Sequence, residues 1–160
     1  MSKANQATNP IKNIALNRKA RHDYFVDETL EVGIVLTGTE VKSLRAGRVN
    51  LRDGYVVVRD GELWMTNVHI APYDQGNREN HEPRRERKLL AHRRQIDRLY
   101  GRIRERGYTI VPLRLYWERN RVKAEIALVR GKKQYDKRAT LARKESERAI
   151  QRALKDRARS

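Results

Sequence analysis

The chain has 160 residues, and its 37 Lys and Arg side chains outnumber its 20 Asp and Glu side chains, for a formal net charge of +17. This length and an apolar share of 38% suit one domain with one small core, which argues against a two-domain enzyme. The absence of cysteine excludes disulfides, a thiol nucleophile and cysteine zinc sites. The excess of positive charge predicts an anionic partner for a soluble, cytoplasmic protein, with nucleic acids first and acidic lipid surfaces second.

The first predicted elements follow a polar leader. Residues 1–16 show no hydrophobic period, so we expect them to form a flexible N-terminal segment. Asn17 is expected to cap a short helical turn at residues 18–21. Alternating apolar residues at 30–36 predict a strand with one buried face. Thr39 is then expected to cap a short helix that packs on the sheet.

A hairpin and a loop are predicted next. The dipeptide Asp60-Gly61 separates two apolar runs, 55–59 and 62–66, and readily adopts the positive φ angles of a tight hairpin turn. Residues 74–87 have no hydrophobic period and predict a long exposed loop.

The remaining elements complete a recognisable order. Apolar residues at helical spacing predict a helix over 92–106, and two alternating strands, 111–117 and 122–128, form a second hairpin. The order of strand, short helix, hairpin, helix and hairpin predicts a mainly-β fold, an oligonucleotide-binding (OB) type β-barrel with short flanking helices, over residues 17–130. Residues 131–160 hold few apolar side chains and are expected to form a basic C-terminal tail outside the barrel.

Positive charge gathers in two segments. Residues 84–106 carry ten Lys or Arg against three acids, and residues 132–159 carry eleven against four. Arg predominates in both, and its planar guanidinium suits phosphate oxygens and base stacking. Tyr135 lies among cations without apolar neighbours, so we expect it to stack on RNA, the alternative being an exposed Tyr without a role. Trp117 and Tyr100 lie on apolar stripes and are expected in the core.

Catalytic motifs are missing from the sequence. Residues 131–133, Gly-Lys-Lys, lack both the first glycine and the final hydroxyl residue of a phosphate-binding loop. The four histidines have no metal-site spacing, and the acidic residues are dispersed among bases. We therefore expect no enzyme, no metal and no cofactor.

Four segments carry a family resemblance: Ala15–His22 (ALNRKARH), Gly38–Gly47 (GTEVKSLRAG), Arg87–Leu90 (RKLL) and Gly131–Arg138 (GKKQYDKR). In this order and spacing they closely resemble the bacterial SsrA-binding protein family, small protein B, from about residue 14 to the C-terminus. The resemblance implies an adaptor that binds the tRNA-like domain of transfer-messenger RNA (tmRNA, SsrA RNA). It also implies delivery of alanyl-tmRNA with elongation factor Tu to stalled ribosomes for trans-translation.

The resemblance implies two sets of site residues. RNA contacts at the elbow of the tRNA-like domain are implied for Asn17, Arg18, Lys19, Arg21, His22, Glu31, Lys88, Leu90 and Lys123. From the residues alone, Asn17 could instead be a helix cap, Glu31 an outward strand carboxylate and Leu90 a core residue. As an acid on an RNA surface, Glu31 could accept hydrogen bonds from base edges or sugar hydroxyls.

The second set lies in the tail. The resemblance implies that the tail is disordered in the free protein and becomes helical in the empty message channel. Contacts near the small-subunit decoding centre are implied for Lys132, Lys133, Tyr135, Asp136, Lys137 and Arg138. Contacts in the mRNA channel are implied for Arg152, Leu154 and Lys155. Some relatives have His where Tyr135 stands, so a protonation-dependent contact is not expected there.

Two other functions stay open at this point. A general basic ribosome-associated RNA-binding protein or RNA chaperone would bind RNA weakly and lose it steeply with salt, because counterion release dominates such binding. An RNA-processing nuclease would cleave in a metal-dependent way. The adaptor hypothesis predicts selective RNA binding that survives moderate salt. We also expect the protein to be monomeric when free and to have no membrane partner.

Overall fold

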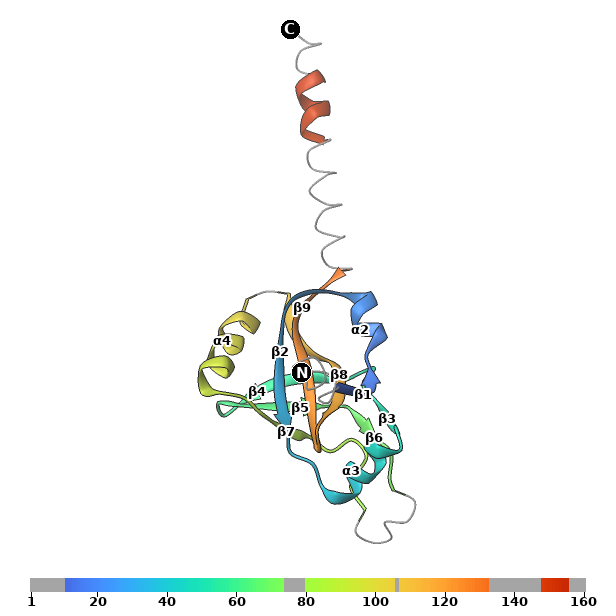
Figure 1. The fold of residues 1–160 in the computed structure, drawn as a ribbon. Helices are drawn as coiled ribbons and strands as arrows, with labels where there is room; N and C mark the ends of the chain where they lie inside the picture. Colours follow the sequence, from blue (N-terminus) through green and yellow to red (C-terminus); the bar gives the residue numbers. More distant parts are fainter. Residues whose placement is uncertain (1–10, 74–79, 106, 133–147, 156–160) are drawn as a thin grey trace, which may run out of the picture.

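A computed structural model describes residues 11–73, 80–105, 107–132 and 148–155 (Figure 1). The strands are β1 (Ile11–Leu16), β2 (Tyr24–Ile34), β3 (Val49–Asn50), β4 (Tyr55–Arg59), β5 (Glu62–Thr66), β6 (His69–Ile70), β7 (Arg87–Leu90), β8 (Tyr108–Glu118) and β9 (Arg121–Gly131). The labelled helices are α2 (Arg18–Asp23), α3 (Gly38–Arg45) and α4 (Arg93–Ile103). None of the helices in these described ranges is long and apolar enough to cross a membrane.

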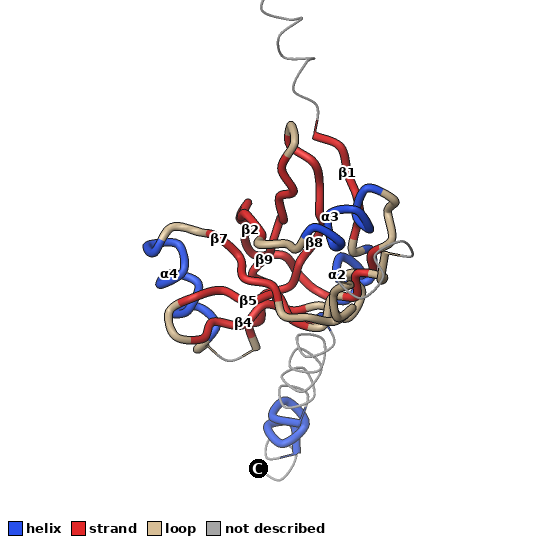
Figure 2. The backbone as a smooth tube through the Cα atoms, turned by 90° about the horizontal axis from the view of Figure 1, so that it is seen from below, coloured by secondary structure: helices blue, strands red, loops and turns tan. Residues whose placement is uncertain are grey.

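The main sheet is closed. Its strand order is β1-β8-β4-β5-β7-β2-β9, and a further pairing of β8 with β9 joins the two sides into a barrel. Strands β3 and β6 form a separate small sheet. In Figure 2, α4 lies on one side of the barrel, and α2 and α3 lie on the other. The predicted mainly-β barrel with short flanking helices is confirmed.

Two apolar clusters stabilise the barrel, one inside it and one on its outer surface. The interior cluster takes alternate residues of β9, among them Ala124, Ile126 and Leu128, and packs them against β5, β7 and α4. The second cluster joins Ala20 of α2 to the outward residues Ala127 and Val129 of β9. Helix α2 therefore covers the part of the outer face of β9 around Ala127 and Val129.

Strand β8 changes faces along its length. A β-bulge between Pro112 and Arg114 shifts the register against β9. As a result, Val111 and Leu113 belong to the outer cluster, whereas Leu115 belongs to the interior. The expectation that these residues share one buried face is wrong, because an extra residue at a bulge reverses the alternation.

The N-terminal expectation is wrong for residues 11–16. These residues form β1, which pairs antiparallel with β8. Their sequence gives little signal because most of the strand is exposed at the edge of the sheet. Residues 1–10 lie outside the described residues.

The turns and caps agree with the sequence in most places. Asp60 and Gly61 have φ angles of 53° and 74°, and Arg59 pairs with Glu62 across the predicted hairpin turn. The N-cap of α3 is Thr37 rather than Thr39: its hydroxyl accepts from the Glu40 backbone N–H, and the Glu40 carboxylate accepts from the Thr37 N–H. This reciprocal capping box explains why the helix begins two residues earlier.

Two expectations near α4 are corrected. Arg87 was expected in an exposed loop but is fully buried in β7, and residues 74–79 of that loop lie outside the described residues. Tyr100 was expected in the core but is 47% exposed, because it lies on the outer side of α4. The predicted helix itself is confirmed, with His92 at its N-cap, and Trp117 packs against the interior cluster as expected.

Only part of the C-terminal segment is described. Residues 148–155 are helical, and Ile150 and Leu154 are both exposed in it. The expected change from disorder to helix on binding is not tested by these residues and stays a prediction.

Candidate nucleic-acid interface

The outer face beyond α2 brings together residues from four strands. On β2, Gly33 lies opposite Leu90 of β7 on one side and Lys123 of β9 on the other. Lys123 in turn lies opposite Tyr116 of β8. Two residues away along these strands, on the same face, Glu31 of β2 lies opposite Glu125 of β9. Glu125 in turn lies opposite Arg114 of β8. We call this surface the outer patch; its residues are Glu31, Gly33, Leu90, Arg114, Tyr116, Lys123 and Glu125.

The apolar part of the outer patch is exposed. Leu90 keeps 52% of its surface in contact with solvent, so it is not a core residue. A Cβ atom at Gly33 would lie 3.2 Å from the Leu90 Cβ atom, which shows how closely Leu90 packs over the bare backbone. Leu90 and Lys123 also line one shallow groove, together with Trp117. The arrangement offers an apolar contact beside a cation.

The polar part of the outer patch is an ordered charge network. Glu125 is shared by two cations, Arg21 of α2 at 3.6 Å and Arg114 at 3.5 Å. The Arg114 guanidinium also lies 4.4 Å from the centre of the Tyr116 ring. The Tyr116 hydroxyl donates a hydrogen bond to Oε2 of Glu31. Glu31 is therefore an exposed carboxylate with one oxygen held in place.

The state of the Tyr116 hydroxyl follows from its surroundings. Burial raises the pKa of Tyr116 above its ordinary value of 10.0, and the hydrogen bond to Glu31 raises that pKa further. The hydroxyl therefore stays protonated near neutral pH and remains a hydrogen-bond donor.

Asn17 fixes the helix that borders the outer patch. Its Nδ2 donates to the carbonyl oxygens of Leu51 at 3.2 Å and Pro112 at 2.8 Å, and its Oδ1 accepts from the Ala20 N–H at 3.1 Å. The residue is only 2% exposed. Its polar groups are thus engaged in holding α2 on the barrel, as the helix-cap alternative expects, and the RNA contact implied for Asn17 stays a prediction.

The other predicted residues of α2 are available at the surface. Arg18 is exposed, Lys19 pairs with Asp53 at 3.4 Å, and the side chain of His22 is 88% exposed beside Asp23. Arg21, on the same helix, contacts the outer patch through its ion pair with Glu125.

A buried ion cluster fixes the strand that carries Leu90. Glu40 of α3 accepts hydrogen bonds from Arg85 at 2.6 Å and from the fully buried Arg87 at 2.5 Å. Arg87 also donates to the carbonyl oxygens of Val68 and Pro83. Its neighbour Lys88 points to the outer side of β7 and pairs with Glu62 at 2.9 Å.

The tail residues predicted from the sequence are only partly described. Lys132 lies 5.4 Å from the centre of the Phe25 ring, at the end of β9. Arg152, Leu154 and Lys155 are exposed in the helix at 148–155. Lys133, Tyr135, Asp136, Lys137 and Arg138 lie outside the described residues.

Sequence reasoning missed Arg114, Tyr116 and Glu125. Glu125 occupies an outward position in the alternation of β9, so that alternation could have indicated it. Arg114 and Tyr116 were harder to find, because the bulge that precedes Arg114 reverses which residues of β8 face outward.

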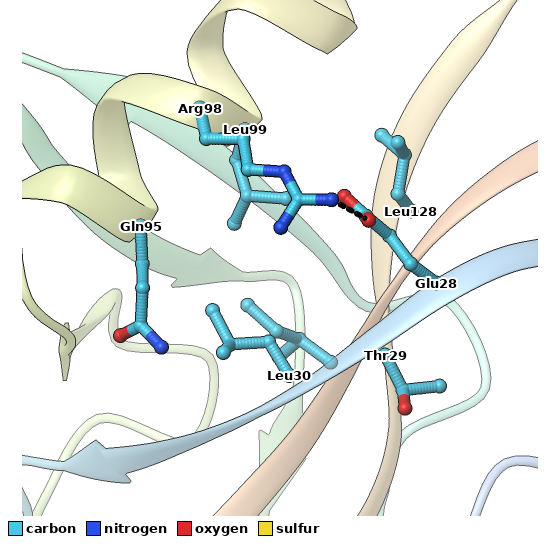
Figure 3. Close-up of a pocket in the computed structure, with 8 residues that line it drawn as sticks. Glu28, Thr29, Leu30, Gln95, Arg98, Leu99 and Leu128 are labelled. Atoms are coloured by element: carbon cyan, nitrogen blue, oxygen red, sulfur yellow. Dashed lines mark hydrogen bonds and ion pairs between the residues drawn. The ribbon is translucent and has the colours of Figure 1, made fainter.

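A second recess lies between α4 and the barrel, away from the outer patch (Figure 3). Its lining combines apolar side chains, among them Leu30, Leu99 and Leu128, with polar ones, and Arg98 pairs with Glu28 at 2.7 Å across it. No group of three or more His, Cys, Asp or Glu side chains suited to a metal ion is present in the described part of the chain. The recess holds no set of residues that resembles a catalytic centre.

Comparisons with known proteins point to one family. A family model described as SmpB protein matches residues 14–156. An SsrA-binding protein of Roseiflexus castenholzii is 62% identical over 147 residues, which cover 91% of this chain and 93% of the relative. An SsrA-binding protein of Pelobacter propionicus is 59% identical over 148 residues, covering 92% and 97%. A solved structure described as "tmRNA-SmpB: a journey to the center of the bacterial ribosome" matches with a TM-score of 0.64 and 50% identity, covering 74% of this chain and 83% of that one.

Proposed function

The chain belongs to the SmpB protein family, and from this premise we propose that it binds transfer-messenger RNA and brings it to stalled ribosomes for trans-translation. In this role the protein is an RNA-binding adaptor of the cytoplasm rather than an enzyme. The relatives are named for SsrA binding, and the matched structure joins tmRNA, SmpB and the bacterial ribosome.

One observation supports the proposal of a selective RNA site: a fixed, exposed carboxylate, Glu31, lies on the same surface as the cations Arg114 and Lys123. Glu31 would repel phosphate groups, so it weakens attraction to any polyanion that offers phosphates alone. It favours a partner that presents donors, and RNA does so through 2′-hydroxyls and the amino groups of unpaired bases. The exposed Leu90 adds an apolar contact for a base or sugar.

The cations around the outer patch supply the phosphate contacts in this proposal. Arg18, Lys19 and Arg21 lie on helix α2, where Arg21 contacts Glu125, and Lys123 lies within the patch. Lys88 borders it on the β7 side. Phosphate contacts of this kind position an RNA, whereas the carboxylate and Leu90 discriminate among RNAs. We assign this surface to the elbow of the tRNA-like domain.

The tail has a separate role in the proposal. Residues 132–138 act near the decoding centre of the small subunit, and Arg152, Leu154 and Lys155 act in the empty mRNA channel. The exposed side chains of the helix at 148–155, with two cations beside Leu154, suit a groove lined by RNA phosphates. Delivery occurs as alanyl-tmRNA with elongation factor Tu.

Competition binding tests the proposal. Labelled tRNA-like domain is bound to the purified full chain in physiological salt, where the Debye length is about 8 Å, and ordinary tRNA is added in excess. We expect the complex to persist. Equal displacement by ordinary tRNA, with a steep loss of both in higher salt, would instead identify a general basic RNA binder.

A further inference from the structure

The two carboxylates of the outer patch are held in different ways. Glu31 and Glu125 lie directly opposite each other on adjacent antiparallel strands, a placement in which like charges destabilise a sheet. Glu125 is neutralised by Arg21 and Arg114. In the described part of the chain, the hydrogen bond to Glu31 comes from the Tyr116 hydroxyl, to Oε2. Among the described residues, Glu31 is thus held by a neutral donor and makes no ion pair.

Tyr116 is well built to hold a group in place. Tyr116 is 1% exposed, so its side chain cannot change rotamer without disturbing its neighbours. The Arg114 guanidinium lies over the ring, and Asn13 of β1 accepts from Arg114 at 3.0 Å. From β8, the hydroxyl reaches across β9 to β2.

We propose that Tyr116 is a positioning residue for RNA binding: its hydroxyl holds Oε2 of Glu31 and leaves Oε1 as a preorganised acceptor for the hydroxyl or amino donors of the RNA. The inference rests on the proposed function and adds to it a residue that does not itself contact RNA. The raised pKa of Tyr116 supports it, because the hydroxyl remains a donor throughout the physiological pH range.

Preorganisation explains why the hydroxyl affects affinity. A Glu side chain on an exposed strand otherwise samples several rotamers, and binding must immobilise it. A donor that is already fixed in the free protein removes most of this cost. Removing the hydroxyl leaves the aromatic ring in place, so the barrel keeps its packing while Glu31 becomes mobile.

A double-mutant cycle separates positioning from a structural role. The affinity for the tRNA-like domain is measured for the full chain, for Tyr116→Phe, for Glu31→Ala and for the double variant. We expect Tyr116→Phe to weaken binding about fivefold in the native background, the size of one modest hydrogen-bond effect, and to change it less than about twofold when Glu31 is Ala. Equal losses in both backgrounds would overturn the inference.

Two further measurements keep the outcome interpretable. Tyr100→Phe removes the hydroxyl of a Tyr that is 47% exposed on α4, so its affinity should equal that of the native chain. Denaturant unfolding of every variant shows whether the barrel remains folded. Selective binding by the native chain combined with no effect of Tyr116→Phe would reject the positioning role of Tyr116 but not the proposed function. Unselective binding by the native chain would reject the proposed function.

Discussion

At the scale of single residues, Glu31 combines an unfavourable position in the sheet with a proposed role in RNA binding. Its carboxylate faces Glu125, and it accepts the hydrogen bond of Tyr116. A Gln in its place would relieve the repulsion between the strands. Its amide could still accept from Tyr116 through the carbonyl oxygen, but would then present an NH₂ donor where the carboxylate presents an acceptor.

We therefore predict opposite effects of Glu31→Gln on stability and on binding. The free energy of unfolding rises by about 0.5 kcal/mol, within the range for cross-strand charge pairs. Affinity for the tRNA-like domain falls about tenfold, as for loss of a hydrogen bond to a charged group. Urea unfolding and equilibrium binding measure the two effects, and Asp97→Asn on α4 is the control for loss of one negative charge. A fall in stability would contradict the like-charge argument.

Glu40 shows how burial and partners compete at one carboxyl group. Burial is the largest single influence and raises the pKa of Glu40. The hydrogen bonds from Arg85 and the Thr37 backbone, with the charge and hydrogen bond of Arg87, together lower that pKa below the ordinary value of 4.5. A pKa that is lower in the folded state stabilises the protein above the unfolded pKa, and this stability is lost as pH falls through the folded pKa.

This sign predicts acid sensitivity from the cluster around Glu40. The free energy of unfolding should fall as the pH decreases below about 4.5, measured by urea unfolding at a series of pH values. Arg85→Gln removes one source of the lowered pKa, so its profile should be flatter over this interval. Parallel profiles for the two proteins would assign the acid sensitivity to other carboxylates.

At the scale of elements, α2 depends on Asn17 for its place beside the outer patch. Asn17→Ala removes both the cap and the amide donors to Leu51 and Pro112, whereas Asn17→Ser keeps a capping acceptor. We predict that both variants are destabilised, and that Ala costs about 1 kcal/mol more than Ser. Amide hydrogen exchange in α2 should increase in the same order. Equal exchange in all three proteins would show that packing of Ala20 alone holds the helix.

Elements with a clear period or turn signal were the ones that the sequence predicted. Alternation identified β2 and β9, helical spacing identified α4, and Asp60-Gly61 identified the β4–β5 hairpin. Strand β7 has only four residues. In the sequence its Arg87 is typical of a surface residue, whereas in the structure it is buried beside Glu40. A short strand with a buried charge is defined by its tertiary partners, which alternation cannot reveal.

The outer patch was predictable only in part for the same reason. Glu31, Leu90 and Lys123 came from family resemblance, and the register now brings them onto one face. Tyr116 came from neither source, because its position on the outer face depends on the bulge in β8. The contact between Tyr116 and Glu31 is set by pairing across three strands rather than by local sequence.

At the scale of the whole molecule, the barrel and the tail are proposed to act on different RNAs. The outer patch uses residues between Glu31 and Glu125, all in the barrel. Removing residues 139–160 deletes seven Lys or Arg and three Asp or Glu, a net change of −4. If the tail acts only at the ribosome, the affinity and salt dependence for the isolated tRNA-like domain should change little, because few phosphate contacts are lost there.

We therefore predict that truncation after residue 138 leaves binding of the tRNA-like domain within about twofold, whereas tagging of nascent chains on stalled ribosomes is lost. A variant with residues 139–160 in scrambled order keeps the charge and length of the tail and serves as the matched control. Loss of tagging in both variants would assign the function to the side-chain order of the tail. Restoration by the scrambled tail would assign it to net charge alone. Loss of RNA affinity together with tagging in the truncated chain would contradict the division of roles, because the barrel would then need the tail to bind its own RNA.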